Sequence, residues 1–127
     1  MKKNSPPESV PSESFEQEQV FKFARANQIK YPELQLLNGS LNGVKLSIGQ
    51  ATKAKRQGMR KGYPDIFLPV SSGCWHGLFI ELKKESGGRT SKEQRTWINK
   101  LLDNGYYAVV CRGHKEAIET IKIYLGI

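Results

Sequence analysis

Three charged residues stand at the ends of two apolar segments and could do chemistry together. Within GYPDIFLPVSSGCWHGLFIELKK, residues 62–84, Asp65 precedes the first apolar run, and Glu81 and Lys83 lie near the end of the second. If the second run is a β-strand, Glu81 and Lys83 project from one face, because successive side chains of a strand alternate between faces. The intervening Leu82 then projects to the opposite face, where it can be buried. The pattern predicts a carboxylate and an ammonium group side by side in one cleft.

The chemistry of this group depends on Asp65 approaching Glu81, which follows if the two strands pair. Two carboxylates that lie close together repel each other unless a cation separates them. Mg²⁺ suits such a pair, because it binds oxygen ligands and keeps several of its waters. The Lys83 ammonium would then place positive charge where a phosphate or an activated water binds. The alternative is that these are ordinary surface charges, since Pro-Asp and Glu-x-Lys both occur often by chance.

Helices and strands that would position these residues follow from periodicity and capping signals. Residues 13–28 have helical spacing behind a potential N-cap at Ser12, and Ser91 with Gln94 forms a capping box at the start of another helix, whose Trp97 is expected in the core. Strands are predicted within PELQLL, DIFLPV, GLFIELK and YYAVVC, with a short helix inside 44–62 and a final helix from about 115 to 125.

The order of these elements predicts the fold class. Continuous apolar strands that alternate with helices are typical of an α/β protein with a mixed central sheet flanked by helices. The strand–helix–strand unit in residues 78–111 has the length of a crossover between parallel strands. We therefore expect the strand YYAVVC to run parallel to the strand GLFIELK.

The charge of the chain indicates a polyanionic partner. The 127 residues include 20 Lys and Arg against 12 Asp and Glu, a formal net charge of +8. The stretch between Leu34 and Pro64 contains no acid. Its basic residues, which we expect to contact DNA phosphates, are Lys45, Lys53, Lys55, Arg56, Arg60 and Lys61. A merely solvated basic face and an anionic membrane surface are the alternatives.

Composition excludes several functional classes and suggests the domain boundaries. Cys74 and Cys111 make no zinc-binding or disulfide pattern, which fits free thiols in a reducing cytoplasm. No run of about 18 apolar residues is present to span a membrane. The N-terminal MKKNSPPESVPSES lacks the apolar segment of a signal peptide. We expect residues 1–12 to be a disordered leader and residues 13–127 to form a single domain.

The spacing of the charged residues resembles a known nuclease pattern. Pro64-Asp65, then fifteen residues, then Glu81-Leu82-Lys83 is similar to the PD-(D/E)xK motif. More specifically, the chain resembles the VRR-NUC (virus-type replication-repair nuclease) family over roughly residues 13–125, most strongly from Gly62 to Cys111. The resemblance implies a restriction-endonuclease-like fold, Mg²⁺-dependent endodeoxyribonuclease activity in which Mn²⁺ substitutes, and a prokaryotic or phage source with a cytoplasmic location.

The resemblance also implies roles for individual residues. Asp65, Glu81 and the main-chain carbonyl of Leu82 would bind the metal. Lys83 would orient or activate the attacking water and stabilise the charge that develops on the phosphate. Gln94, in the first turn of its helix, would lie near the site.

The resemblance implies two further site residues, whose identification depends on how the first helix and the Asn-Gly turn align with the family. The family places a glutamate from the first helix at the metal, and Glu13 fits best here, with Glu16 and Glu18 as alternatives. Asn42 matches an Asn-Gly turn on the DNA-facing side.

The function expected from these observations is structure-specific DNA cleavage. The resemblance implies branched DNA, because small stand-alone members look like Holliday-junction resolvases. Symmetric cuts in two strands require two sites, so a C₂ homodimer is the expected assembly. Two alternatives remain: a nickase, flap or restriction-type nuclease on the same fold, and a basic DNA-binding module that does not cleave. The intact set of Asp65, Glu81 and Lys83 argues against the second.

Overall fold

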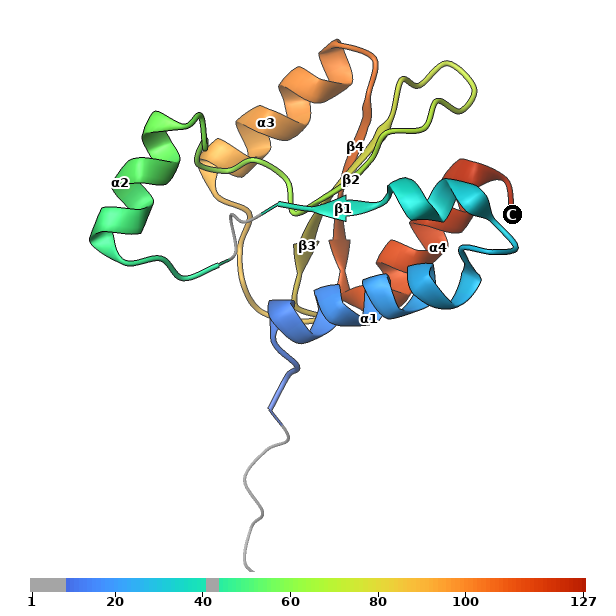
Figure 1. Ribbon diagram of the computed structural model, residues 1–127, viewed down its shortest axis with the longest axis horizontal. Coiled ribbons are helices and arrows are strands. Elements are labelled where there is room, and N and C mark those ends of the chain that lie inside the picture. Colours follow the sequence, from blue (N-terminus) through green and yellow to red (C-terminus); the bar gives the residue numbers. More distant parts are fainter. Residues whose placement is uncertain (1–8, 41–43) are drawn as a thin grey trace, which may run out of the picture.

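A four-stranded mixed sheet forms the centre of the molecule, shown as a computed structural model that describes residues 9–40 and 44–127 (Figure 1). The elements in chain order are α1 (Glu13–Asn27), the 3₁₀ helix η1 (Pro32–Leu36), β1 (Asn38–Gly39), α2 (Ile48–Arg56), β2 (Ile66–Leu68), β3 (Leu78–Lys83), α3 (Lys92–Asp103), β4 (Tyr107–Arg112) and α4 (Gly113–Leu125). The expected α/β class is therefore confirmed. No helix in these described residues is both long and apolar enough to cross a membrane.

The sheet has the strand order β1-β2-β3-β4, so β2 and β3 are its inner strands. β1 pairs with β2 and β2 pairs with β3 in antiparallel fashion, with Ile66 opposite Ile80. β3 and β4 are parallel, with Lys83 opposite Arg112, and α3 provides the crossover between them. The predicted parallel pairing of GLFIELK with YYAVVC is thus correct. Glu81 and Lys83 lie on β3, which has a neighbouring strand on each side.

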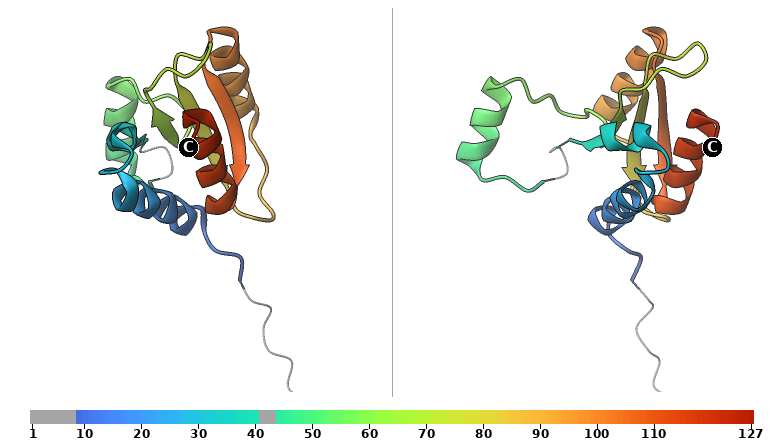
Figure 2. Two further views of the ribbon diagram at one scale, coloured as in Figure 1. Left: turned by 90° about the vertical axis from the view of Figure 1, so that its right-hand side faces the viewer. Right: turned by 45° about the vertical axis from the view of Figure 1, so that its right-hand side comes forward.

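Strand β3 separates two packed layers, because all six of its residues are buried and their side chains alternate between faces. Leu78, Ile80 and Leu82 belong to the main core, which they form with residues of α1 and α4. The other face, which carries Phe79, Glu81 and Lys83, is the one that α3 covers (Figure 2). The alternation therefore places the two charged side chains of β3 beneath α3.

An aromatic cluster fills the space between this face and α3. The rings of Phe67 and Phe79 stack with centroids 4.2 Å apart. Tyr63 packs edge-on against Phe79 at 5.7 Å and against Trp97 at 5.0 Å. Trp97 is half-buried and lies outside the main core, so the prediction of a core position was wrong: it belongs to this second layer. The cluster fixes the segment just ahead of Asp65.

The helices adjoining the site begin as their capping signals predict. The Ser12 hydroxyl accepts a hydrogen bond from the Phe15 amide at 3.0 Å at the start of α1. At the start of α3, the Ser91 hydroxyl accepts from the Gln94 amide at 3.1 Å, and the Gln94 side-chain oxygen accepts from the Ser91 amide at 2.8 Å. Both helices therefore have a fixed first turn, and that turn is the part of each helix nearest the charged end of β3.

The predicted strand in PELQLL was wrong. Residues Pro32–Leu36 form a 3₁₀ helix instead, and only Asn38–Gly39 pairs in the sheet. The physical reason is the spacing of Leu34 and Leu37, which are three residues apart and both buried. A 3₁₀ helix repeats every three residues and puts such a pair on one side, whereas a strand would send them to opposite faces.

Helix α2 was correctly expected, but it buries none of its residues. It has its own capping box, in which Ser47 and Gln50 make the same reciprocal bonds as Ser91 and Gln94. Ile48 at its start is 89% exposed. In Figure 1 and the right-hand view of Figure 2, α2 stands apart from the sheet. The helix is an arm whose surface is available to a partner.

Candidate active site

The five residues predicted for catalysis line one cavity of about 380 Å³. They are Glu13 from α1, Asp65 ahead of β2, Glu81 and Lys83 from β3, and Gln94 from α3. We call this space the Asp65–Glu81 cavity. Lys61, Gly62, Tyr63, Arg89 and Ser91 complete its lining.

The Asp65 side chain takes the hydrogen bond of the Leu82 amide, which a backbone carbonyl of the neighbouring strand would otherwise accept. Its Oδ2 accepts a hydrogen bond from the Leu82 amide at 2.7 Å. Continuing the register of Ile66 opposite Ile80 would bring Pro64 opposite Leu82, and proline has no N–H to donate. Because the N–H and C=O of one strand residue face the same neighbour, the Leu82 carbonyl points to the side of Asp65 and receives no ladder bond from Pro64. The carboxylate and the carbonyl are therefore oxygens presented together.

Glu81 is buried against Asp65, with only 2% of its surface exposed. Gln94 Nε2 donates to Glu81 Oε2 at 3.1 Å. Burial raises the pKa of Glu81 to about 9, aided by the hydrogen bond and charge of Asp65 and by the charge of Glu13, while the charge of Lys83 opposes the rise. The physical cause is that a second buried negative charge next to Asp65 is costly. The pair therefore holds a proton at neutral pH unless a cation takes its place.

The donor atoms of this pair fit a hard divalent cation. Asp65, Glu81 and the Leu82 carbonyl could supply oxygen ligands, and the raised pKa of Glu81 reflects the cost of a buried negative charge that a cation would offset. In the described ranges 9–40 and 44–127, no three His, Cys, Asp or Glu side chains converge as a metal-holding group. Two carboxylates and a carbonyl could hold Mg²⁺, which binds oxygen ligands and keeps several waters.

Of the three candidates on the first helix, Glu13 is the one in the cavity. Glu16 is only 1% exposed and is engaged elsewhere: its Oε2 accepts from the His114 amide at 2.8 Å, and its Oε1 lies 3.0 Å from His114 Nδ1. Glu18 is exposed. The contact with Glu16 joins α1 to the start of α4 across 98 positions of sequence. Nothing in the local sequence around His114 indicates it.

Gly62 allows the chain to pass directly against the first turn of α3. Its φ is +87°, and a Cβ there would lie 2.7 Å from the Glu93 carbonyl carbon and 2.8 Å from the Gln94 amide nitrogen. No side chain fits in this space. The close approach brings Tyr63 and Asp65 to the same cavity as Gln94.

Arg89 is a cavity residue that the sequence reasoning missed. It follows Gly87 and Gly88, which both have positive φ. The backbone carbonyls of this loop are bound by the side chain of Arg112. The Arg112 guanidinium donates to the carbonyls of Lys84 at 3.3 Å, Gly87 at 2.7 Å and Gly88 at 3.2 Å. The paired glycines are the available signal, but they match no phosphate-loop pattern, and the contact with Arg112 is not readable from sequence.

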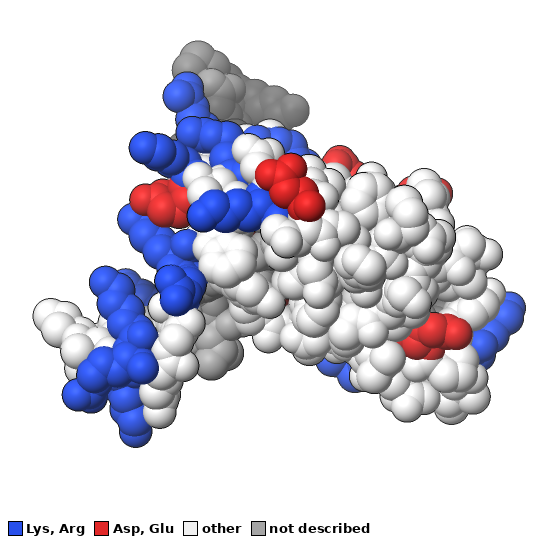
Figure 3. All heavy atoms as spheres, turned by 90° about the horizontal axis from the view of Figure 1, so that it is seen from above, with Lys and Arg blue, Asp and Glu red and all other residues white. Residues whose placement is uncertain are grey.

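The basic residues predicted to contact DNA lie on or beside the α2 arm and are exposed. Among them only Lys61 lines the Asp65–Glu81 cavity, and its Nζ lies 3.7 Å from Glu93 Oε1 in an exposed pair that contributes little stability. Lys55, Arg60 and Lys61 share a neighbouring pocket with Lys100. Figure 3 shows Lys and Arg gathered over the side that carries α2. The predicted contact of Asn42 falls outside the described residues.

Comparison with known proteins agrees with this geometry. A family model, the VRR-NUC domain, matches residues 7–115. A solved structure described as a VRR_NUC domain protein superposes with a TM-score of 0.79 at 29% identity, over 93% of this chain and 91% of that one. No curated protein matches the chain.

The match spans most of the chain and covers the whole of the Asp65–Glu81 cavity. The resemblance noted in the sequence is therefore confirmed, and the domain implies a nuclease-type role in processing DNA. The chain belongs to the VRR-NUC family.

Proposed function

We propose that the protein is a metal-dependent, structure-specific DNA endonuclease that hydrolyses phosphodiester bonds with Mg²⁺, for which Mn²⁺ can substitute. The observation that carries this proposal is the buried Glu81 carboxyl held against Asp65, with Lys83 on the same face of β3. Burying Glu81 and Lys83 next to Asp65 is costly in a domain that only binds DNA, because burial penalises the charged form of each side chain.

The metal would be held by Asp65, Glu81 and the main-chain carbonyl of Leu82. When bound, Mg²⁺ would supply positive charge to the scissile phosphate and lower the pKa of the attacking water. Support comes from the oxygen-only donor set and from the raised pKa of Glu81, which a cation would relieve.

The side chains of the chain itself would divide the remaining work. Lys83 is buried except for 6% of its surface, so its ammonium can serve as a positioned donor to a phosphate oxygen or to the attacking water. Gln94 holds one oxygen of Glu81, which leaves the other to face Asp65. Glu13 extends the acidic wall of the cavity, and Arg89 faces the same space as a further cation for the phosphate.

The DNA would lie across the basic side of the molecule. Exposed Lys and Arg residues of the α2 arm would contact phosphates and fix the position of the duplex without reading its sequence. We propose branched DNA, with Holliday junctions first, and a homodimer that places two cavities for symmetric cuts.

The test is strand cleavage of end-labelled four-way junctions, flaps, nicked duplexes and intact duplexes with Mg²⁺, Mn²⁺ or EDTA. Lys83→Met and Asp65→Asn should abolish cleavage, and Lys84→Met, at the exposed neighbouring lysine, should not. Paired symmetric cuts on the junction alone, together with a dimer mass by light scattering, are the expected results.

Cuts at flaps or nicks in place of junctions would replace the junction-resolving assignment with that activity. Binding without cleavage in either metal would overturn the enzyme proposal and leave a DNA-binding module. A monomer mass in the presence of symmetrically cut junction would overturn the homodimer.

A further inference from the structure

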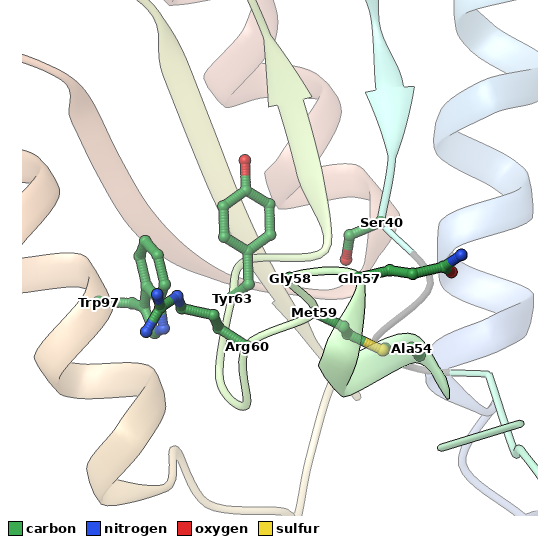
Figure 4. Close-up of a pocket in the computed structure, with 8 residues that line it drawn as sticks. All are labelled: Ser40, Ala54, Gln57, Gly58, Met59, Arg60, Tyr63 and Trp97. Carbon is green, nitrogen blue, oxygen red and sulfur yellow. The ribbon is translucent and has the colours of Figure 1, made fainter. Parts of the chain in front are cut away.

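A second pocket of about 440 Å³ lies beside the Asp65–Glu81 cavity, between the C-terminal part of α2 and Trp97 in the middle of α3. We call it the side pocket. Its lining residues are Ser40, Ala54, Gln57, Gly58, Met59, Arg60, Tyr63 and Trp97 (Figure 4). Its volume lies within the range of about 300–1,000 Å³ that small-molecule sites occupy.

The aromatic side chains of the side pocket are held in place by contacts outside it. Trp97 Nε1 donates to the Lys61 carbonyl at 3.2 Å, which fixes the orientation of the indole. The Tyr63 ring stands at 82° to the indole and packs on Phe79 behind it. Because both rings are already ordered, a flat group that stacked on them would lose little freedom in the protein.

The remaining lining combines apolar atoms with hydrogen-bonding groups. Figure 4 shows Trp97, Arg60 and Tyr63 toward one side of the pocket and Met59 with Ser40 toward the other. Ser40 Oγ is buried and has no hydrogen-bond partner in the part of the chain that the structure describes.

The polar groups suit the edge of a nucleobase. Gln57 and Arg60 line the pocket as well, and Figure 4 shows the Arg60 guanidinium beside Trp97, whereas the Gln57 amide is directed away from the two rings. Arginine forms paired hydrogen bonds with base edges. A flat heterocycle with acceptors on its edge therefore matches the two rings and the Arg60 guanidinium.

The position of the side pocket connects it to DNA. It shares Gly58, Met59, Arg60 and Trp97 with the neighbouring pocket that Lys55, Lys61 and Lys100 line. Among the residues that the structure describes, no acid lines either pocket. Tyr63 lines both the side pocket and the Asp65–Glu81 cavity. A strand whose phosphate lies in the cavity would thus pass the mouth of the side pocket.

We infer that the side pocket receives one unstacked nucleobase from the strand next to the scissile phosphate. The inference rests on the proposed nuclease function and specifies its substrate. That substrate is DNA with an unpaired or easily unstacked nucleotide beside the cut, as at a branch point. An intact duplex would have to break a pair and a stack to fill the pocket, which disfavours it.

The test combines removal of single bases with filling of the pocket. Abasic sites are placed one at a time at each position around the cut in a four-way junction, and affinity is measured with Lys83→Met protein in Mg²⁺. Ala54→Phe adds a ring inside the side pocket. Thr52→Phe adds the same ring on the same helix but outside the lining. Neither change removes a buried residue, because α2 has none.

We expect one abasic position to weaken binding by about 5- to 150-fold, the effect of losing one base–aromatic stack. Ala54→Phe should weaken binding of the intact junction by a similar factor and abolish the dependence on that base. Thr52→Phe should keep both the affinity and the dependence.

A uniform response to abasic sites, or equal dependence in Ala54→Phe and Thr52→Phe, would overturn the inference while leaving cleavage by the wild-type protein intact. A wild-type protein that neither binds nor cleaves any of the DNA substrates would overturn both the inference and the proposed function. The two failures are therefore distinguishable in one set of assays.

Discussion

The side-chain amide of Gln94 connects the first turn of α3 to Glu81. Its oxygen accepts from the Ser91 amide at 2.8 Å and its nitrogen donates to Glu81 Oε2 at 3.1 Å. The Ser91 N–H can only donate, so it fixes the oxygen end of the amide toward itself and leaves the nitrogen for Glu81. The residue that caps the helix is thus also a positioning residue for Glu81.

Gln94→Ala should lower the cleavage rate at saturating DNA by about 10- to 100-fold, the usual effect of removing a hydrogen bond to a metal-binding side chain. The matched control is Gln50→Ala, which breaks the equivalent capping box of α2 away from the cavity. Single-turnover rates and Mg²⁺ titrations of both variants provide the comparison. Equal losses in the two variants would mean that capping alone explains the effect.

Glu81 should make the metal-free protein less stable as pH rises. Its pKa is about 9 in the folded state against an ordinary value of 4.5, so between these values the folded state binds more protons than the unfolded state. The contribution is therefore full below about pH 4.5 and is lost as pH rises toward 9, with a slope of at most about 1.4 kcal/mol per pH unit.

Urea unfolding of the wild-type protein and Glu81→Gln in EDTA, from pH 5 to 9, measures this difference. The free energy of unfolding of the wild type minus that of Glu81→Gln should fall steadily with rising pH, because glutamine does not titrate. Mg²⁺ should stabilise the wild type most at high pH, because metal binding displaces the proton. A constant difference across the range would contradict the raised pKa.

Asp65→Asn and Asp65→Ala should both abolish cleavage but differ in stability. An asparagine oxygen can still accept from the Leu82 amide, whereas alanine leaves that buried N–H without its 2.7 Å partner. We expect Asp65→Ala to be less stable than Asp65→Asn by about 1–3 kcal/mol. Denaturant midpoints give the comparison, and equal midpoints would show that the bond adds no stability.

Gly62→Ala should disrupt the site more than Gly58→Ala. Both glycines have positive φ, but a Cβ at Gly62 would lie 2.7 Å from the Glu93 backbone, whereas nothing lies within 4 Å of one at Gly58. We expect Gly58→Ala to cost about 1 kcal/mol through backbone strain alone. Gly62→Ala should cost more and also reduce cleavage, because Asp65 would shift away from Gln94. Thermal unfolding and cleavage rates test this, and similar behaviour of the two would refute the packing argument.

Neutralising the α2 arm should weaken DNA binding through phosphate contacts. Lys55→Gln should reduce the slope of log affinity against log salt by about 1. Lys115→Gln, at an exposed position on α4, is the matched control and should leave the slope unchanged. Binding isotherms between low and moderate salt give both slopes. An equal change in both variants would indicate a general charge effect in place of a defined arm.

The sequence predicted those features that depend on local pattern. Alternation along β3 determined that Glu81 and Lys83 share a face, and the pairing of β2 with β3 brings Asp65 to Glu81. The capping box at Ser91 located the start of α3. Each inference uses a repeat or a spacing that backbone geometry imposes on a few neighbouring residues.

The features that could not be predicted depend on contacts between distant segments. Glu16 is buried against His114, which lies 98 positions later in the sequence. This contact takes Glu16 away from the Asp65–Glu81 cavity and leaves Glu13 as the helix α1 residue that lines it. Arg112 holds the loop before Arg89 through three backbone carbonyls, which carry no sequence signal. Trp97 has the spacing of a core residue, and its contacts with the Lys61 carbonyl and the Tyr63 ring, which lie more than 30 positions earlier in the sequence, place it at the side pocket instead.

Because α2 buries no side chain, its folding is energetically almost separate from that of the sheet. Its amide hydrogens should exchange with solvent through openings that leave the core intact, far faster than those of β3. Amino-acid changes on this helix can then alter the contacts that α2 makes with a partner without lowering the stability of the sheet that carries Asp65 and Glu81. Selection, or a protein engineer, can therefore vary the surface of α2 while the Asp65–Glu81 cavity stays unchanged.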